Sequence, residues 1–152
     1  MRTFALHPFF AVPFLALAMV GSVLAADIQT TPVQNAQVDD FSAGKSAIDA
    51  KQWSQAVVSF GKVVANNPKN ADAYNYLGYA NRWLGRYDEA FAAYGKALAL
   101  DPNHKGALQY SGIAYVKTSQ KALAQARLNQ LQALCATCTE TTELAKAITA
   151  AQ

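Results

Sequence analysis

The sequence predicts an all-α fold in which pairs of helices stack as an α-solenoid, and three observations lead to this prediction. A pattern recurs every 34 residues, so that Gly78 falls on Gly44 in one direction and on Gly112 in the other. A fixed period of this length is typical of stacked helical repeats. Apolar residues recur at spacings of three or four, as on one face of a helix. No run of more than a few residues alternates with the period of two that indicates a strand.

Residues 1–25 are predicted to be a secretory signal. Arg2 gives the segment a positive start, the stretch that follows up to Ala26 is uncharged, and Val23-Leu24-Ala25 fits the small-x-small cleavage pattern. Cleavage is expected after Ala25, and Ala26 is nearly as suitable. A retained membrane anchor is the alternative, but the apolar run after Pro13 is short for a span of about 20 residues. We therefore expect the mature chain to be periplasmic or secreted, without an integral membrane span.

Residues 26–37 are predicted to be a flexible linker, because they are polar, contain Pro32 and show no apolar periodicity. The repeat domain is expected over residues 38–152. Its repeats are expected at about 37–70, 71–104 and 105–138, each consisting of a helix, a tight turn and a second helix.

The middle repeat shows why these elements should form. Its first helix is expected to end at Gly85, because glycine readily takes the left-handed conformation that follows a helix C-terminus. Its second helix is expected to begin near Asp88 and to end before Pro102, because a proline pushes the preceding residue out of helical geometry. Gly78 should stand where the two helices cross closely, with Tyr94 filling the space beside it.

The same repeat carries a family resemblance, in Tyr74-x-x-Leu77-Gly78, then Ala90-x-x-x-Tyr94, Ala97 and Pro102. These residues resemble the tetratricopeptide repeat, and the chain looks like a small exported bacterial protein of that family. Residues kept in the first repeat are Gly44, Trp53, Ala56, Phe60 and Pro68, and those kept in the third are Gly112, Tyr115, Ala124 and Leu128. The resemblance implies a solenoid of three helix-turn-helix repeats that binds protein or peptide and is not an enzyme.

A C-terminal capping helix is expected at about residues 138–151, because the last unit of a solenoid needs a cover with a polar outer face. Leu144, Ala147 and Ile148 form one apolar stripe in this segment. Thr137 and Glu140 match a capping box at its start.

The family resemblance also implies that the first helices line a concave partner-binding groove. We expect six residues to form it: Lys45, Asn75, Tyr79, Arg82, Gln109 and Ile113. Asp49, Tyr76, Trp83, Tyr110 and Lys117 are expected beside them. The alternative is that the apolar residues of this series belong to the interhelical core, namely Phe41, Ile48, Ile113 and Val116. The Lys/Asn clamp of chaperone-tail-binding relatives is absent, since its places hold Phe41, Tyr76, Gly106 and Tyr110.

Cys135 and Cys138, the only cysteines, form a CxxC for which three interpretations stand. A structural disulfide fits an exported protein. A redox pair is the second, because a thiol near a helix N-terminus has a lowered pKa. A haem or metal site is the third, but Thr139 replaces the histidine of a CxxCH motif. Zinc would need two more ligands, and His104 is the only histidine of the mature chain. We expect no metal and no cofactor.

Charge and motifs narrow the function further. Loss of Arg2 with the signal leaves 12 basic and 10 acidic residues, without the basic stripe that nucleic-acid binding requires. No catalytic set of side chains stands out, and His104 is interpreted as a solvated turn residue. The sequence therefore predicts a non-catalytic scaffold for a peptide or partner protein of the cell envelope. A thiol-disulfide accessory protein is the alternative, and self-association is a further possibility.

Overall fold

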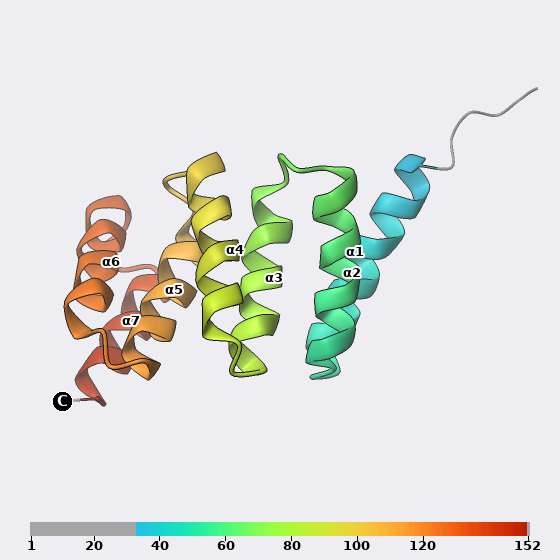
Figure 1. Ribbon diagram of the computed structural model, residues 1–152. Coiled ribbons are helices and arrows are strands. Elements are labelled where there is room, and N and C mark those ends of the chain that lie inside the picture. The colour runs from blue at the N-terminus through green and yellow to red at the C-terminus, as the bar shows by residue number, and fades with distance from the viewer. Residues whose placement is uncertain (1–32, 152) are drawn as a thin grey trace, which may run out of the picture. The chain divides into compact units, whose positions relative to one another are not determined.

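The computed structural model describes residues 33–151, with side chains from Asp39 onward, and these residues form seven helices and no strand (Figure 1). In chain order they are α1 (Val33–Asp49), α2 (Trp53–Asn66), α3 (Ala71–Trp83), α4 (Tyr87–Leu100), α5 (Lys105–Lys117), α6 (Lys121–Leu134) and α7 (Thr139–Thr149). None of the seven is both long enough and apolar enough to cross a membrane. The predicted signal at residues 1–25 lies outside the described residues, as does the linker up to residue 32.

The helices confirm the predicted solenoid. α1 with α2, α3 with α4 and α5 with α6 form three helix pairs that stand beside one another in chain order, and α7 packs against the last pair (Figure 1). Each interface between neighbours has its own small core. The fully buried residues of the middle core are Tyr94 and four alanines. Such small residues allow the helices to approach closely.

The turn inside each pair contains one residue in the left-handed region, always at the same place in the repeat. These residues are Lys51 with φ 58°, Gly85 with φ 74° and Ser119 with φ 60°. Gly85 adopts this conformation without steric strain, as the sequence predicted, whereas a residue with a Cβ loses about 1 kcal/mol there. The middle repeat therefore has the most relaxed of the three turns.

The glycines spaced by 34 residues mark the closest contacts between helices. A Cβ placed on Gly44 would lie 2.7 Å from the ring of Phe60, and one on Gly78 would lie 2.6 Å from the ring of Tyr94. Both rings are buried and come from the second helix of the same repeat. The predicted contact between Gly78 and Tyr94 is therefore confirmed, and in it the Tyr94 ring lies directly against the backbone of α3.

In the third repeat, the side chain that packs against the glycine comes from outside the repeat. A Cβ on Gly112 would meet Leu144 of α7 at 2.5 Å, although repeat spacing makes Leu128 the counterpart of Tyr94. Leu128 is shorter than tyrosine, and Leu144 packs with it in one buried cluster. The predicted C-terminal helix thus completes the core of the last repeat in addition to covering it.

Asn70 and His104 both cap the first helix of a repeat. The Asn70 side chain accepts a hydrogen bond from the Ala73 N–H at 2.9 Å, and Nδ1 of His104 accepts one from the Ala107 N–H at 3.2 Å. Nε2 of His104 lies 3.0 Å from Oδ1 of Asp72 in the preceding repeat. The interpretation of His104 as a solvated turn residue is therefore wrong, because its ring is a helix cap that also ties two repeats together.

The start of α7 differs from its prediction. Cys138, not Thr137, is the N-cap residue, so Glu140 lies one position too early for the predicted capping box. No side chain caps this helix; instead the Thr141 hydroxyl donates a hydrogen bond to the carbonyl oxygen of Cys135 at 2.7 Å.

The start of α1 also differs, because α1 begins at Val33 inside the segment predicted to be a linker. Residues 33–37 contain neither glycine nor proline, and Gln and Ala are good helix formers. Because these residues are mostly polar and show no apolar periodicity, the sequence pattern did not predict this part of the helix.

The Gly78 contact predicts opposite effects for two alanine substitutions. Gly78→Ala should lower the free energy of unfolding by about 1–2 kcal/mol, since overpacking against the Tyr94 ring outweighs the better helix propensity of alanine. Gly95→Ala is the matched control in a helix with nothing within 4 Å of a new Cβ. It should raise the free energy of unfolding by up to about 1 kcal/mol. Denaturant unfolding of the full chain measures both, and shifts in the same direction would contradict the tight contact.

The His104 cap predicts a specific rescue. His104→Ala should lower the free energy of unfolding by about 1 kcal/mol, because the Ala107 N–H loses its acceptor. His104→Asn should restore most of this loss, as Asn70 fills the equivalent position in α3. Thermal unfolding of the three proteins at one pH measures the effect. An asparagine variant as unstable as the alanine variant would show that the cap is unimportant.

Candidate functional site

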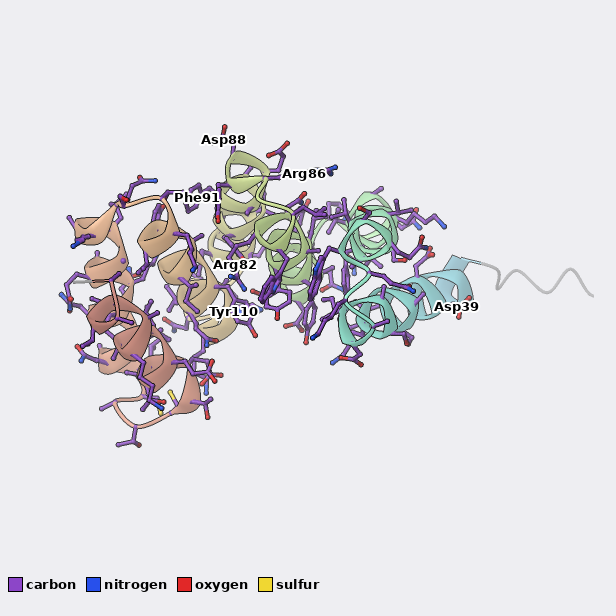
Figure 2. The ribbon with its side chains drawn as sticks, turned by 90° about the horizontal axis from the view of Figure 1, so that it is seen from below. Asp39, Arg82, Arg86, Asp88, Phe91 and Tyr110 are labelled. Atoms are coloured by element: carbon purple, nitrogen blue, oxygen red, sulfur yellow. The ribbon has the colours of Figure 1, made fainter. Side chains whose placement is uncertain are left out.

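Three of the six predicted groove residues share one face of α3. Asn75, Tyr79 and Arg82 follow one another at spacings of four and three residues, which places them on one stripe of the helix. Arg82 and Tyr110 lie near each other between α3 and α5 in Figure 2, and Arg86 lies on the opposite side of α3 and α4. We call the surface formed by Lys45, Asn75, Tyr76, Tyr79, Arg82, Trp83 and Tyr110 the α3 face.

Aromatic rings pack along the α3 face in an unbroken series. The Trp53 and Trp83 rings stack with centroids 5.1 Å apart, and Tyr79 meets them edge-on at 6.0 and 6.2 Å. Tyr79 also contacts Tyr110 of α5 at 4.7 Å, so the series links two repeats. Trp83 remains 50% exposed. A large aromatic surface open to solvent is characteristic of protein-binding sites.

The Arg82 guanidinium lies over this aromatic series. Its central carbon is 5.1 Å from the Tyr79 ring centroid, 5.0 Å from that of Trp83 and 6.0 Å from that of Tyr110. These are cation–π distances. Among the described residues Arg82 forms no ion pair with a carboxylate. The rings therefore hold the cation in place without neutralising its charge.

Three polar atoms on this face are buried without a hydrogen-bond partner. Within the described part of the chain, these are Nε of Arg82, the Tyr94 hydroxyl and Oδ1 of Asn75. Arg82 and the Tyr94 hydroxyl are adjacent, whereas Asn75 lies about two helical turns away on α3. Burial raises the pKa of Tyr94 above its usual range, and the adjacent Arg82 opposes this only in part. Buried polar groups in a folded protein are normally satisfied, so three unsatisfied ones on one face are unusual.

Lys45 adds a second cation to the α3 face. Its Nζ donates to the Tyr76 hydroxyl at 3.4 Å and lies 5.3 Å from the centroid of the same ring. The Lys45 side chain comes from α1 and is exposed. It therefore extends the positive part of the face by one repeat.

The other two predicted groove residues are packed beneath α7. Gln109 is buried and its side-chain amide donates a hydrogen bond to Glu143. Ile113 packs against the leucine cluster shared by α5, α6 and α7. The structure therefore supports, for Ile113, the alternative that it belongs to the interhelical core. The accessible face is shorter than the sequence suggested, because α7 covers its α5 end.

Tyr76, Trp83 and Tyr110 lie on the α3 face, beside the groove predicted from the repeat spacing, whereas Trp53 and Tyr94 were predicted to have purely structural positions. The structure brings Trp53 into the aromatic series and the Tyr94 hydroxyl beneath Arg82. The repeat spacing could not find these two, since they begin or occupy second helices and reach the face only through the length of their side chains.

The two cysteines are free thiols in the structure, so the predicted disulfide is not formed there. Sγ of Cys138 donates to the carbonyl oxygen of Cys135 at 3.1 Å and lies 3.5 Å from Oγ1 of Thr141. Hydrogen bonds from the side chain of Cys135, and next from Thr141, lower the pKa of Cys138. Within residues 39–151 no group of three or more His, Cys, Asp or Glu side chains could hold a metal ion.

A hollow lies on the other side of α3, between it and the second helices α2 and α4. It has a volume of about 450 Å³, and its walls include Val57, Tyr74, Leu77, Arg86 and Ala93. Tyr74 and Tyr79 therefore stand on opposite faces of the same helix. This hollow carries no unpaired buried polar atom, which distinguishes it from the α3 face.

Comparison with known families and folds agrees with the helical arrangement. Residues 41–105 match the family model described as tetratricopeptide repeat. A search of curated proteins finds no match.

Solved structures show the same fold. The tetratricopeptide domain of Arabidopsis OM64 is 21% identical and superposes with a TM-score of 0.72, covering 78% of this chain and 98% of that one. The TPR2B domain of yeast Sti1, solved as a pHsp70 complex, is 22% identical with a TM-score of 0.71 and coverages of 77% and 96%. The Yersinia enterocolitica type III secretion chaperone SycD, in complex with a peptide of the translocator YopD, is 17% identical. Its TM-score is 0.68, with coverages of 77% and 89%.

Proposed function

Because this chain is a tetratricopeptide repeat protein, we propose that it is a non-catalytic scaffold that holds a peptide segment or partner protein on its α3 face. The observation that carries the proposal is the aromatic series under an unneutralised arginine. Tyrosine, tryptophan and arginine are the residues that contribute most to protein-binding energy. Packing alone would not require an arginine cation or a half-exposed indole at this place.

The dimensions of the α3 face favour a short extended segment. Adjacent packed helices are separated by about 10 Å, so a segment that crosses from α1 past α3 to α5 spans roughly 20 Å. An extended chain advances about 3.3 Å per residue, which gives roughly six residues. SycD was solved with a peptide of the translocator YopD and the Sti1 domain as a pHsp70 complex, and their likeness to this chain supports a peptide or protein ligand here.

We place this scaffold in the cell envelope on the basis of the predicted signal at residues 1–25. Its partner would then be an envelope protein, either periplasmic or with a periplasmic segment. In this compartment the protein would help to assemble or stabilise a complex without acting on it chemically.

Site-directed photo-crosslinking tests the scaffold function. A photoreactive phenylalanine derivative in place of Tyr79 should crosslink in living cells to a distinct protein, because Tyr79 lies at the centre of the α3 face. The crosslinked species should be released with the periplasmic fraction or be retained with envelope membranes. Gel analysis and mass spectrometry of the conjugate identify the partner.

The same derivative in place of Tyr74 is the matched control, since Tyr74 is on the same helix but lines the hollow between α2 and α4. It should give no conjugate with that partner. Conjugates at Tyr74 and none at Tyr79 would show that the partner binds the opposite face of α3. An absence of conjugates at both positions would contradict a scaffold function.

A second candidate function, thiol-disulfide exchange, is favoured by the surroundings of Cys138. The pKa of Cys138 is lowered at the N-cap of α7, which favours its thiolate form, and Cys135 three residues earlier would supply the resolving thiol. The Cys138 thiolate would attack one sulfur of a client disulfide and release the other as a thiolate. The Cys135 thiolate would then displace the client from Cys138, so that the client is reduced and the pair becomes a disulfide.

The pH dependence of alkylation tests whether Cys138 is an activated thiol. In the reduced protein its alkylation rate should reach half its maximum below the ordinary cysteine pKa of about 8.5, because the hydrogen-bonded thiolate persists at lower pH. Thr141→Val should move this midpoint to higher pH, and Thr141→Ser should leave it nearly unchanged. Fragmentation mass spectrometry distinguishes the two cysteines. An unchanged midpoint in the valine variant would remove the support for a redox role.

A further inference from the structure

The hollow between α2, α3 and α4 exists because two of its side chains are smaller than their counterparts one repeat later. Val57 and Asn81 line the hollow, and the positions 34 residues further along the chain hold Phe91 and Tyr115. The rings of Phe91 and Tyr115 stack with centroids 4.5 Å apart and planes inclined by 19°, so they fill the corresponding place at the next interface. The hollow of about 450 Å³ is therefore a feature of the first repeat interface and not of the repeat in general.

The size and lining of the hollow suit an aromatic ligand. The difference in size between the two pairs of side chains amounts to roughly one substituted aromatic ring. Leu77 and Ala93 stand beside Val57 in the wall, and the ring of Tyr74 belongs to the same wall. An aromatic guest gains ring–ring contacts with a tyrosine in addition to the burial of apolar surface. A mostly apolar hollow of this volume is in the range of small-molecule sites.

Asn81 places one polar group in the wall of the hollow. Its side chain is largely buried, and its Nδ2 donates a hydrogen bond to the Leu77 carbonyl oxygen at 3.0 Å. This hydrogen bond fixes the amide and leaves Oδ1 as the acceptor. A hydroxyl on the ring of a ligand is a donor that such an acceptor can bind.

Charged side chains of α4 stand at the edge of the hollow. Arg86, Glu89 and Lys96 line it and are exposed, and none of them takes part in an ion pair among the described residues. Figure 2 shows Arg86 on the side of α3 and α4 away from Arg82. Two cations against one carboxylate give this edge a net positive charge, which attracts an anionic ligand. The counterparts of the three residues one repeat later carry no charge; they are Gln120, Leu123 and Gln130.

We propose that this hollow binds a small phenolic acid. The ring of the ligand lies beside Tyr74, in the space that Phe91 and Tyr115 fill at the next interface. Its hydroxyl donates to Oδ1 of Asn81, and its carboxylate lies at the positive edge formed by α4. The site is on the opposite side of α3 from the α3 face, so it is independent of the proposed scaffold function.

Titration of the full chain with para-hydroxyphenylpropionate tests the proposal, with the methyl groups of valine and leucine labelled for NMR. The methyl signals of Val57 and Leu77 should shift and saturate with a dissociation constant of roughly 1 mM or lower, as expected for a ligand of this size. Leu134 is the internal control, because it is an exposed leucine of α6 outside the hollow. Its methyl signals should not shift. Shifts of similar size at Leu134, or no shift at Val57 and Leu77, would overturn the site.

Three related compounds assign the recognition to the groups of the ligand. Phenylpropionate lacks the hydroxyl and should bind about fivefold more weakly, as expected for one lost hydrogen bond. The compound para-ethylphenol lacks the carboxylate and should bind about threefold more weakly, as expected for an exposed ion pair. Cyclohexylpropionate lacks the aromatic ring and should bind more weakly than phenylpropionate. Equal affinities of all four compounds would overturn the phenolic acid as the ligand.

Two variants locate the binding in the hollow. Val57→Phe combined with Asn81→Tyr should fill it and abolish the shift at Leu77, since the chain already packs the same two rings at the next interface. Arg86→Gln combined with Lys96→Gln changes only exposed side chains. It should weaken binding of the phenolic acid about threefold and leave that of para-ethylphenol unchanged.

Saturable binding that persists in the filled variant would overturn the site. An unaltered preference for the acid over para-ethylphenol in the charge variant would overturn the role of the positive edge. The charge variant and the four compounds on the unaltered chain remain decisive even if the filled variant fails to fold.

Discussion

The contact of an aromatic ring with bare helix backbone is the constraint on which the rest of the structure depends. Phe60 lies on Gly44 and Tyr94 lies on Gly78, in each case where a Cβ would overlap the ring. This contact sets the distance between the two helices of a repeat and recurs with the 34-residue period. The distance in turn decides which side chains of neighbouring first helices can touch. Tyr79 of α3 contacts Tyr110 of α5, the first helix of the next repeat.

The same ring connects packing to the proposed site. Phe60 and Tyr94 occupy equivalent positions and both are buried, but only Tyr94 carries a hydroxyl. Phenylalanine would satisfy the contact with Gly78 without placing an unpaired polar group beneath Arg82. A buried hydroxyl without a partner costs about 1–3 kcal/mol. The tyrosine of the middle repeat therefore does more than pack, because it places a hydroxyl next to Arg82.

Repeat spacing predicted the elements that depend on local sequence and failed where a third helix intervenes. Helix pairs, the Gly85 turn and the stripe of Asn75, Tyr79 and Arg82 follow from period and residue type. Gln109 and Ile113 occupy equivalent places in the next repeat, yet α7 covers them. The repeat spacing could not predict the position of α7. Leu128 is shorter than Tyr94 and leaves a space next to Gly112, which Leu144 of α7 fills. His104 was missed for a different reason, since its role as a cap required comparison with Asn70 one period earlier.

α7 also explains why the site lies at α3. Gln109 and Glu143 are separated by one repeat period, and the N-caps Asn70, His104 and Cys138 follow at the same interval. α7 therefore occupies the sequence position of the first helix of a fourth repeat. Its Leu144, however, packs directly against Gly112 of α5. That displacement closes the α5 end of the face and leaves α1 and α3 to offer their side chains. The cations Lys45 and Arg82 belong to the open part and the carboxylate of Glu143 to the closing helix. α7 thus completes the last core and also places a negative charge at one end of a surface that is positively charged at the other.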